Sequence, residues 1–210
     1  MAEPRTTIHL VRHGEVHNPD HILYERLPGY HLSERGQAMA RRVGEHFESR
    51  RGRVDTLVAS PLERAQETAA PIAEALGLEI RTDPRVIEAG NSLAGRRITL
   101  PNLLKPSAAR RLYNPLRPSW GEPFEAIAER MHAAIGDLRE EVGGGTAVVV
   151  SHQSPVWRAR LHAEGRPLWP MARGRACSLA SVTTLVYEGD KLSAVCYCEP
   201  AADLLPPHLR

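Results

Sequence analysis

Short runs of apolar residues recur along this chain and predict strands that are buried in a sheet. The predicted strands are residues 7–11, 56–59, 79–82 and 146–150. Two more runs lie between Leu179 and Tyr197 on either side of Glu188-Gly189-Asp190, a turn sequence that predicts a β-hairpin.

Between these runs, apolar residues recur at every third or fourth position, which is the spacing of amphipathic helices. The predicted helices begin at Ser33, follow Ser60 up to Leu76, span 124–142 and lie near 156–163. The second has the clearest start, because Ser60 can cap it, Pro61 suits its first position and Glu63 completes a capping box. The alternation of strands and helices predicts an α/β fold with a mostly parallel central sheet and helices on both faces.

The helical and strand periods are both lost in the proline-rich stretch at about 89–121, which predicts a small cap-like insertion in a single domain spanning 1–210. This stretch has basic residues and no acidic ones. The basic residues are Arg96, Arg97, Lys105, Arg110, Arg111 and Arg117. Their charge would concentrate anionic substrates beside a site. The alternatives are a solvated cap face or a subunit contact, which would make the protein a homodimer.

The charge composition indicates which kind of molecule the protein binds. Lysine and arginine total 27 against 25 aspartate and glutamate, a net charge of +2 that favours a small molecule over nucleic acid or a membrane. No apolar stretch approaches the roughly 20 residues that span a bilayer, and residues 1–7 hold no apolar signal core, so we expect a cytoplasmic protein. The odd cysteine count of three argues against a disulfide framework.

The candidate chemistry lies directly after two of the predicted strands. Arg12-His13-Gly14-Glu15 follows the first strand, and His152 follows the run at 146–150. Because the carboxyl ends of parallel strands meet at one edge of a sheet, we expect these groups to lie close together. Histidines with an arginine suit phosphoryl transfer without a metal. The even spacing of His9, His13, His17 and His21 raises the alternative of a metal site, but a strand and the loop after it do not place them on one face, so we predict no metal.

Several motifs in order resemble those of the histidine phosphatase superfamily, also called phosphoglycerate mutase-like. They are Arg12-His13-Gly14-Glu15 with Asn18, Leu32-Ser33-Glu34-Arg35-Gly36-Gln37-Ala38, Ser60-Pro61-Leu62-Glu63-Arg64-Ala65, Glu88, Gly121-Glu122, and Val150-Ser151-His152. The resemblance implies that His13 is the nucleophile and Glu88 the general acid. It also implies phosphate-binding roles for Arg12, Asn18, Arg64 and His152.

The sequence departs from the family pattern at Gln153, which replaces the usual glycine after the second histidine and would either reshape the edge of the pocket or add a hydrogen bond there. Arg26, on the loop that borders the substrate in the family, and Arg96 and Arg97 in the insertion are further candidates for substrate binding. For Arg26, the alternative is a surface salt bridge with Glu25. Glu15 either orients a nearby histidine or forms a solvated salt bridge.

The resemblance predicts a phosphomonoester hydrolase that needs no cofactor and acts on a small anionic phosphorylated metabolite through a phosphohistidine. Phosphoglycerate mutase-type transfer is an alternative, although the mutase element Arg-His-Tyr-Gly is absent after Glu88. A non-catalytic module that binds a phosphorylated metabolite is the other alternative. A binder has no use for a carboxyl group beside an anion, so Glu88 favours the enzyme.

Overall fold

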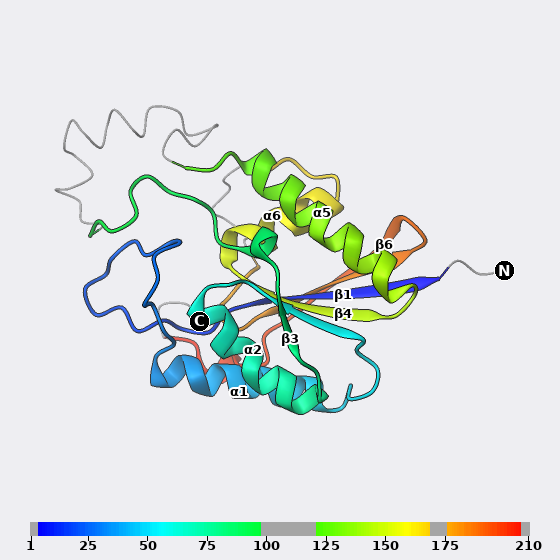
Figure 1. The fold of residues 1–210 in the computed structure, drawn as a ribbon, viewed down its shortest axis with the longest axis horizontal. Helices are drawn as coiled ribbons and strands as arrows, with labels where there is room; N and C mark the ends of the chain where they lie inside the picture. The colour runs from blue at the N-terminus through cyan, green and yellow to red at the C-terminus, as the bar shows by residue number, and fades with distance from the viewer. Residues whose placement is uncertain (1–3, 98–120, 169–175, 207–210) are drawn as a thin grey trace.

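The computed structural model describes residues 4–97, 121–168 and 176–206. Its strands form one six-stranded sheet in the order β3-β2-β4-β1-β5-β6 (Figure 1). The strands are β1 (Arg5–Arg12), β2 (Thr56–Ala59), β3 (Ile80–Thr82), β4 (Thr146–Ser151), β5 (Val182–Glu188) and β6 (Lys191–Cys198). The α-helices are α1 (Glu34–Glu48), α2 (Glu63–Leu76), α5 (Phe124–Val142) and α6 (Gln153–Ala163), and two 3₁₀ helices are η1 (Pro84–Val86) and η2 (Ala202–Leu204).

The first four strands of this order run parallel, and β5 and β6 add an antiparallel hairpin. In the register, Val11 of β1 lies opposite Val150 of β4, which in turn lies opposite Ala59 of β2. The carboxyl ends of these three central strands therefore meet at one edge. The predicted α/β class with a mostly parallel sheet is confirmed, and so is the hairpin.

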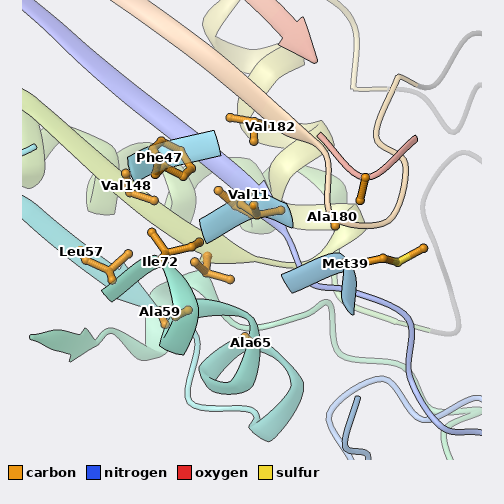
Figure 2. Close-up of a cluster of buried hydrophobic side chains, with 14 of the residues drawn as sticks. Val11, Met39, Phe47, Leu57, Ala59, Ala65, Ile72, Val148, Ala180 and Val182 are labelled. Carbon is orange, nitrogen blue, oxygen red and sulfur yellow. The ribbon is translucent and has the colours of Figure 1, made fainter. Parts of the chain in front are cut away.

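Helices cover both faces of the sheet, α1 and α2 on one side and α5 and α6 on the other (Figure 1). Successive side chains of β4 point to opposite faces of the sheet. Val148 packs in the cluster under α1 and α2, whereas Val149 packs in the cluster under α5 and α6. This is why the run at 146–150 is apolar throughout. Figure 2 shows the first cluster, in which Phe47 of α1 and Ile72 of α2 meet Val148.

Some predicted boundaries were wrong. Helix α2 begins at Glu63 with Leu62 as its N-cap, and no side chain caps it. The Ser60 hydroxyl accepts from the backbone N–H of Leu62 at 3.4 Å, ahead of the helix, and also lies 2.7 Å from His152 Nε2. Helix α6 begins at Gln153, directly after β4, because Pro155 falls within the first turn, where a missing backbone N–H costs nothing.

The cap-like insertion stays a prediction, because residues 98–120 lie outside the described part of the chain. Lys105, Arg110, Arg111 and Arg117 fall in that range. None of the helices in the described ranges is both long and apolar enough to cross a membrane.

Candidate active site

Hydrogen bonds between neighbouring strand ends hold the two motif histidines at adjacent positions. The backbone N–H of His13 donates to the carbonyl of Ser151 at 3.0 Å, and that of Ser60 donates to Val150 at 2.9 Å. The rings of His13 and His152 lie edge to face with their centres 5.1 Å apart, and both are buried. Residues that are far apart in the sequence thus form one pocket at the edge of the sheet.

A backbone contact defines the protonation of His13. Its Nδ1 lies 2.7 Å from the carbonyl oxygen of Gly14. Because a carbonyl can only accept, Nδ1 carries the proton and Nε2 keeps its lone pair. Burial, helped by the positive charges of Arg64 and Arg12, lowers the pKa of His13 well below its usual range. The neutral form of the ring, with the lone pair of Nε2 free, is therefore favoured at neutral pH.

Two arginines bring positive charge to the same pocket. Arg64 is fully buried in the first turn of α2; its Nη2 donates to the backbone carbonyl of Glu25, and its guanidinium lies 4.8 Å from the centre of the Tyr24 ring. Arg12, at the end of β1, donates through Nη1 to the carbonyl of Cys177 at 2.7 Å.

Several hydrogen-bond donors of the two arginines have no acceptor among the described residues. Nε and Nη1 of Arg64, and Nε of Arg12, are buried without a hydrogen-bond partner in the described ranges. An unpartnered buried donor costs roughly 1–3 kcal/mol, and more when it is charged. An anion that accepts from these groups would remove that cost, so the arrangement is suited to a phosphoryl group.

His152 adds a donor to the same set. Its Nε2 contacts the Ser60 hydroxyl, whereas its Nδ1 is buried and has no partner among the described residues. Burial and the nearby His13 lower its pKa well below the usual range. When the Ser60 hydroxyl donates to Nε2, Nδ1 of the neutral ring carries a proton that an anion can accept.

Glu88 supplies a carboxyl group whose pKa is raised. It lies shortly after η1, is 9% exposed, and accepts a hydrogen bond from the Ala89 N–H at 2.8 Å. Burial raises its pKa, although that hydrogen bond and the charges of Arg64 and Arg12 oppose the shift. Since burial outweighs these charges, Glu88 is suited to general-acid catalysis.

Beside Glu88 lies a cavity of about 210 Å³. Its walls include Glu25, Glu122, Gln153 and Ser154 together with the backbone around Gly90. It adjoins the phosphoryl pocket through Glu88 and through Glu25, whose backbone carbonyl accepts from Arg64.

Comparisons with known proteins agree with this geometry. The model of the histidine phosphatase superfamily (branch 1) matches residues 8–200. The chain belongs to the histidine phosphatase superfamily.

This member of the superfamily is similar to uncharacterized protein Rv0525 of Mycobacterium tuberculosis, at 49% identity over 94% of this chain and 98% of the other. It is 31% identical to phosphoserine phosphatase 1 of Hydrogenobacter thermophilus over 70% of this chain and 71% of that one. Among solved structures, YhfR of Bacillus stearothermophilus has the same fold, with a TM-score of 0.77 at 22% identity over 90% of this chain and 95% of that one. Family membership and the phosphatase relative support a phosphatase or mutase enzyme.

The sequence-predicted residues of this histidine phosphatase do not all meet. Arg12, His13, Arg64, His152 and Glu88 come together, and Gln153 lines the adjoining cavity. In the loop after β1, the side-chain amide of Asn18 is hydrogen-bonded to the backbone N–H and carbonyl of Ile22, both at 2.9 Å. Its phosphate-binding role stays a prediction.

The three candidate substrate arginines are used elsewhere or point to solvent. Arg26 bridges the Glu88 carbonyl and the Glu122 carboxylate, so the expected salt bridge with Glu25 is replaced by one with Glu122. Arg96 and Arg97 are exposed, and Arg97 pairs with Asp20 at 2.6 Å. None of the three lines the cavity beside Glu88.

The sequence analysis did not predict the roles of two side chains near the site, and it left two alternatives open for Glu15. Ser60 was expected only to cap a helix, and Glu25 only to pair with Arg26. No pattern in the sequence could have revealed either, because each role depends on a contact with a distant segment. Glu15 binds the Ser33 hydroxyl at 2.6 Å and Arg35 at 3.2 Å, in keeping with the salt-bridge alternative.

Proposed function

We propose that this histidine phosphatase is a phosphomonoester hydrolase that acts on small phosphorylated metabolites through a phosphohistidine at His13. The observation that carries the proposal is the bond from Nδ1 of His13 to the Gly14 carbonyl, at 2.7 Å, in a pocket whose buried arginine donors lack partners. The bond leaves Nε2 free to attack, and the donors can receive the phosphoryl oxygens.

In the first half-reaction, Nε2 of His13 attacks phosphorus and the bond to the ester oxygen breaks. Arg12 and Arg64 stabilise the charge on the equatorial oxygens, and His152 donates one more hydrogen bond. Glu88 gives its proton to the departing oxygen, so that an alcohol leaves rather than an alkoxide.

In the second half-reaction, the Glu88 carboxylate takes a proton from water as the water oxygen attacks phosphorus. The phosphorus–nitrogen bond breaks, which returns neutral His13 and releases inorganic phosphate. Every proton and electron pair is supplied by this chain or by water, so the proposed reaction uses no metal and no cofactor.

A pocket that only bound a phosphorylated metabolite would gain nothing from Glu88. A carboxyl group beside an anion weakens binding when it is ionised, whereas a protonated one is what a leaving alkoxide requires. The raised pKa of Glu88 therefore supports catalysis over a binding module. The missing mutase element supports hydrolysis over transfer between positions.

The test is to trap the intermediate. Rapid quenching in alkali during turnover of a ³²P-labelled phosphate ester should give protein-bound label at His13, and steady turnover should release inorganic phosphate. His13→Ala should lose both, whereas His17→Ala, at an exposed histidine of the same loop, should keep both. Interconversion of phosphoglycerates without phosphate release would show a mutase, and the absence of label and turnover in the wild type would refute the enzyme.

A further inference from the structure

The cavity beside Glu88 has an acidic wall. Glu25, Glu88 and Glu122 line it, and its other described lining residues include no lysine, arginine or histidine. A second observation marks this space as part of a ligand site: Nε and Nη1 of the fully buried Arg64 lack partners, which locates the phosphoryl group next to it. If the phosphoryl group binds there, the cavity beside Glu88 offers space for the leaving group.

The charge of Glu122 is already neutralised. Arg130 donates to Glu122 through Nε at 2.9 Å, and Arg26 donates to it at 2.6 Å. These contacts lower the pKa of Glu122 even though burial opposes them. The two arginines also donate to the carbonyl of Glu88, and neither lines the cavity. The two arginines therefore hold Glu88 and Glu122 in place, and their guanidinium groups do not line the space for the ligand.

Glu25 is placed differently. Among the described residues, its carboxylate accepts one side-chain hydrogen bond, from Asn91 at 3.1 Å. Its backbone has a φ of 37°, a conformation that costs a residue with a side chain of order 1 kcal/mol or more. Through its carbonyl, which accepts from Arg64, this strained residue links the phosphoryl pocket to the cavity. Burial and the nearby Glu88 raise the pKa of Glu25 to about 7.

We propose that Glu25 selects the leaving group, and that the cavity takes an alcohol whose other substituents are hydrogen-bond donors, hydroxyl or ammonium, and not a carboxylate. This inference rests on the proposed hydrolase activity and names the substrate class of the same site. A donor can bind the oxygens of Glu25, whereas a substrate carboxylate would lie against the carboxylate of Glu25 with no cation among the described lining residues.

The proposal changes the expectation from the sequence that the basic insertion attracts an anionic leaving group. Arg96 and Arg97 do not line this cavity, and the other four basic residues lie outside the described ranges. The acidic residues, not the basic ones, therefore lie against the described space for the leaving group.

The test compares kcat/KM for three matched alkyl phosphates: glycerol 3-phosphate, which carries hydroxyls, O-phosphoethanolamine, which carries an ammonium, and 3-phosphoglycerate, which carries a carboxylate. In the wild type, at least one of the two substrates without a carboxylate should exceed 3-phosphoglycerate at least tenfold. Which of them leads tells hydroxyl from ammonium. In Glu25→Gln the ratio should shrink towards one, because the amide removes the repulsion and part of the attraction. Asp20→Asn, which neutralises an exposed carboxylate of the same loop, should leave the ratio unchanged.

A residue that only supports the loop would change kcat/KM for all three substrates by the same factor. An equal change in Glu25→Gln, or a wild type that prefers 3-phosphoglycerate, would overturn the selection by Glu25 while phosphate release and label at His13 persisted. Loss of release and label in the wild type would instead refute the hydrolase proposal itself.

Discussion

Burial moves the pKa values of His13 and Glu88 in opposite directions, and both shifts favour the proposed reaction. The pKa of His13 is lowered, so its ring stays neutral as the pH falls. The pKa of Glu88 is raised, so its carboxyl stays protonated as the pH rises. Desolvation disfavours the charged form in each case, which for histidine is the protonated form and for glutamate the ionised one. Burial in the same pocket therefore favours both the neutral form of His13 and the protonated form of Glu88.

Removing the proton from Glu88 should slow only the substrates that need it. In Glu88→Gln, kcat for an alkyl phosphate should fall about 100-fold or more, whereas kcat for p-nitrophenyl phosphate should change far less, because its leaving oxygen needs little protonation. With the alkyl phosphate, wild-type kcat should also fall as rising pH ionises Glu88. Steady-state kinetics across pH measure both effects, and equal losses on the two substrates would count against Glu88 as the acid.

His9 should make the fold sensitive to acid. It is buried in β1 beside Phe47 and has a pKa lowered by burial from 6.5 to about 4. Between these values the unfolded chain binds the extra proton, so the free energy of unfolding should drop by about 3 kcal/mol as the pH falls from 6.5 to 4. Urea unfolding of wild type and His9→Gln measures this loss. Equal pH slopes in the two proteins would contradict it.

At the scale of the elements, the first turn of α1 packs closely against the loop that follows β1. A Cβ on Gly36 would lie 2.0 Å from the carbonyl oxygen of Glu15, and one on Gly14 would lie 2.6 Å from that of Gly36. Such distances forbid a side chain without backbone movement. The pair of glycines therefore sets how closely the helix holds the loop that carries His13.

Gly36→Ala should consequently impair both folding and catalysis. Displacing the Glu15 backbone should cost about 1–3 kcal/mol of the free energy of unfolding and lower kcat, because the Gly14 carbonyl that orients His13 belongs to the same segment. Gly136→Ala in α5, where a Cβ would meet nothing within 4 Å, should instead stabilise the protein by about 0.5–1 kcal/mol. Urea unfolding and kcat of the two variants test this contrast, and it fails if Gly36→Ala keeps full activity.

The glycine at the crossing of α1 and α2 gives a second control. A Cβ on Gly44 would lie 2.8 Å from the carbonyl of Pro71, at a crossing where no residue of the proposed catalytic set lies. Gly44→Ala should therefore lower the free energy of unfolding and leave kcat of the folded fraction unchanged. A fall in kcat as large as that of Gly36→Ala would show that general loosening of α1, and not the local contact, affects catalysis.

For the molecule as a whole, the buried nitrogens of Arg64 and His152 that have no partner among the described residues are a source of instability that an anion should relieve. Arg64 and His152 are fully buried, and both have ring or guanidinium nitrogens without partners in the described ranges. A ligand that binds only the folded state stabilises it by mass action. Stability and anion binding should therefore be coupled in this protein.

Inorganic phosphate at 100 times its Kd should stabilise the fold by about 2.7 kcal/mol, which for a chain of this length raises Tm by about 5–10 °C. Arg64→Met should remove the response, whereas Arg41→Met, at an exposed position of α1, should keep it. Thermal scans with potassium chloride at matched ionic strength control for general salt effects. An equal rise in Tm for Arg64→Met would show that phosphate acts elsewhere.

Most of the fold was predictable, because the hydrophobic pattern within each strand and helix is enough to predict it. The runs at 56–59 and 146–150 are apolar on both faces, and the stripe at 124–142 repeats with the helical period, so their positions in the sheet and against it follow from burial. The start of α2 was placed too early, because Ser60-Pro61-Leu62-Glu63 fits a capping box, whereas the helix begins at Glu63 with Leu62 as its N-cap. The Ser60 hydroxyl also lies against His152, a contact with a distant segment that a local capping pattern does not contain.

The sequence by itself determined the order of the elements, the family, and the histidines and arginines of the pocket, because hydrophobic period and motif are local properties that survive without coordinates. Only the tertiary structure decided that burial outweighs the arginines at Glu88, that Arg26 pairs with Glu122, and that Glu25 faces the space for the leaving group. The physical reason is that desolvation and charge pairing depend on which remote segments surround a side chain, and one-dimensional spacing does not contain that information.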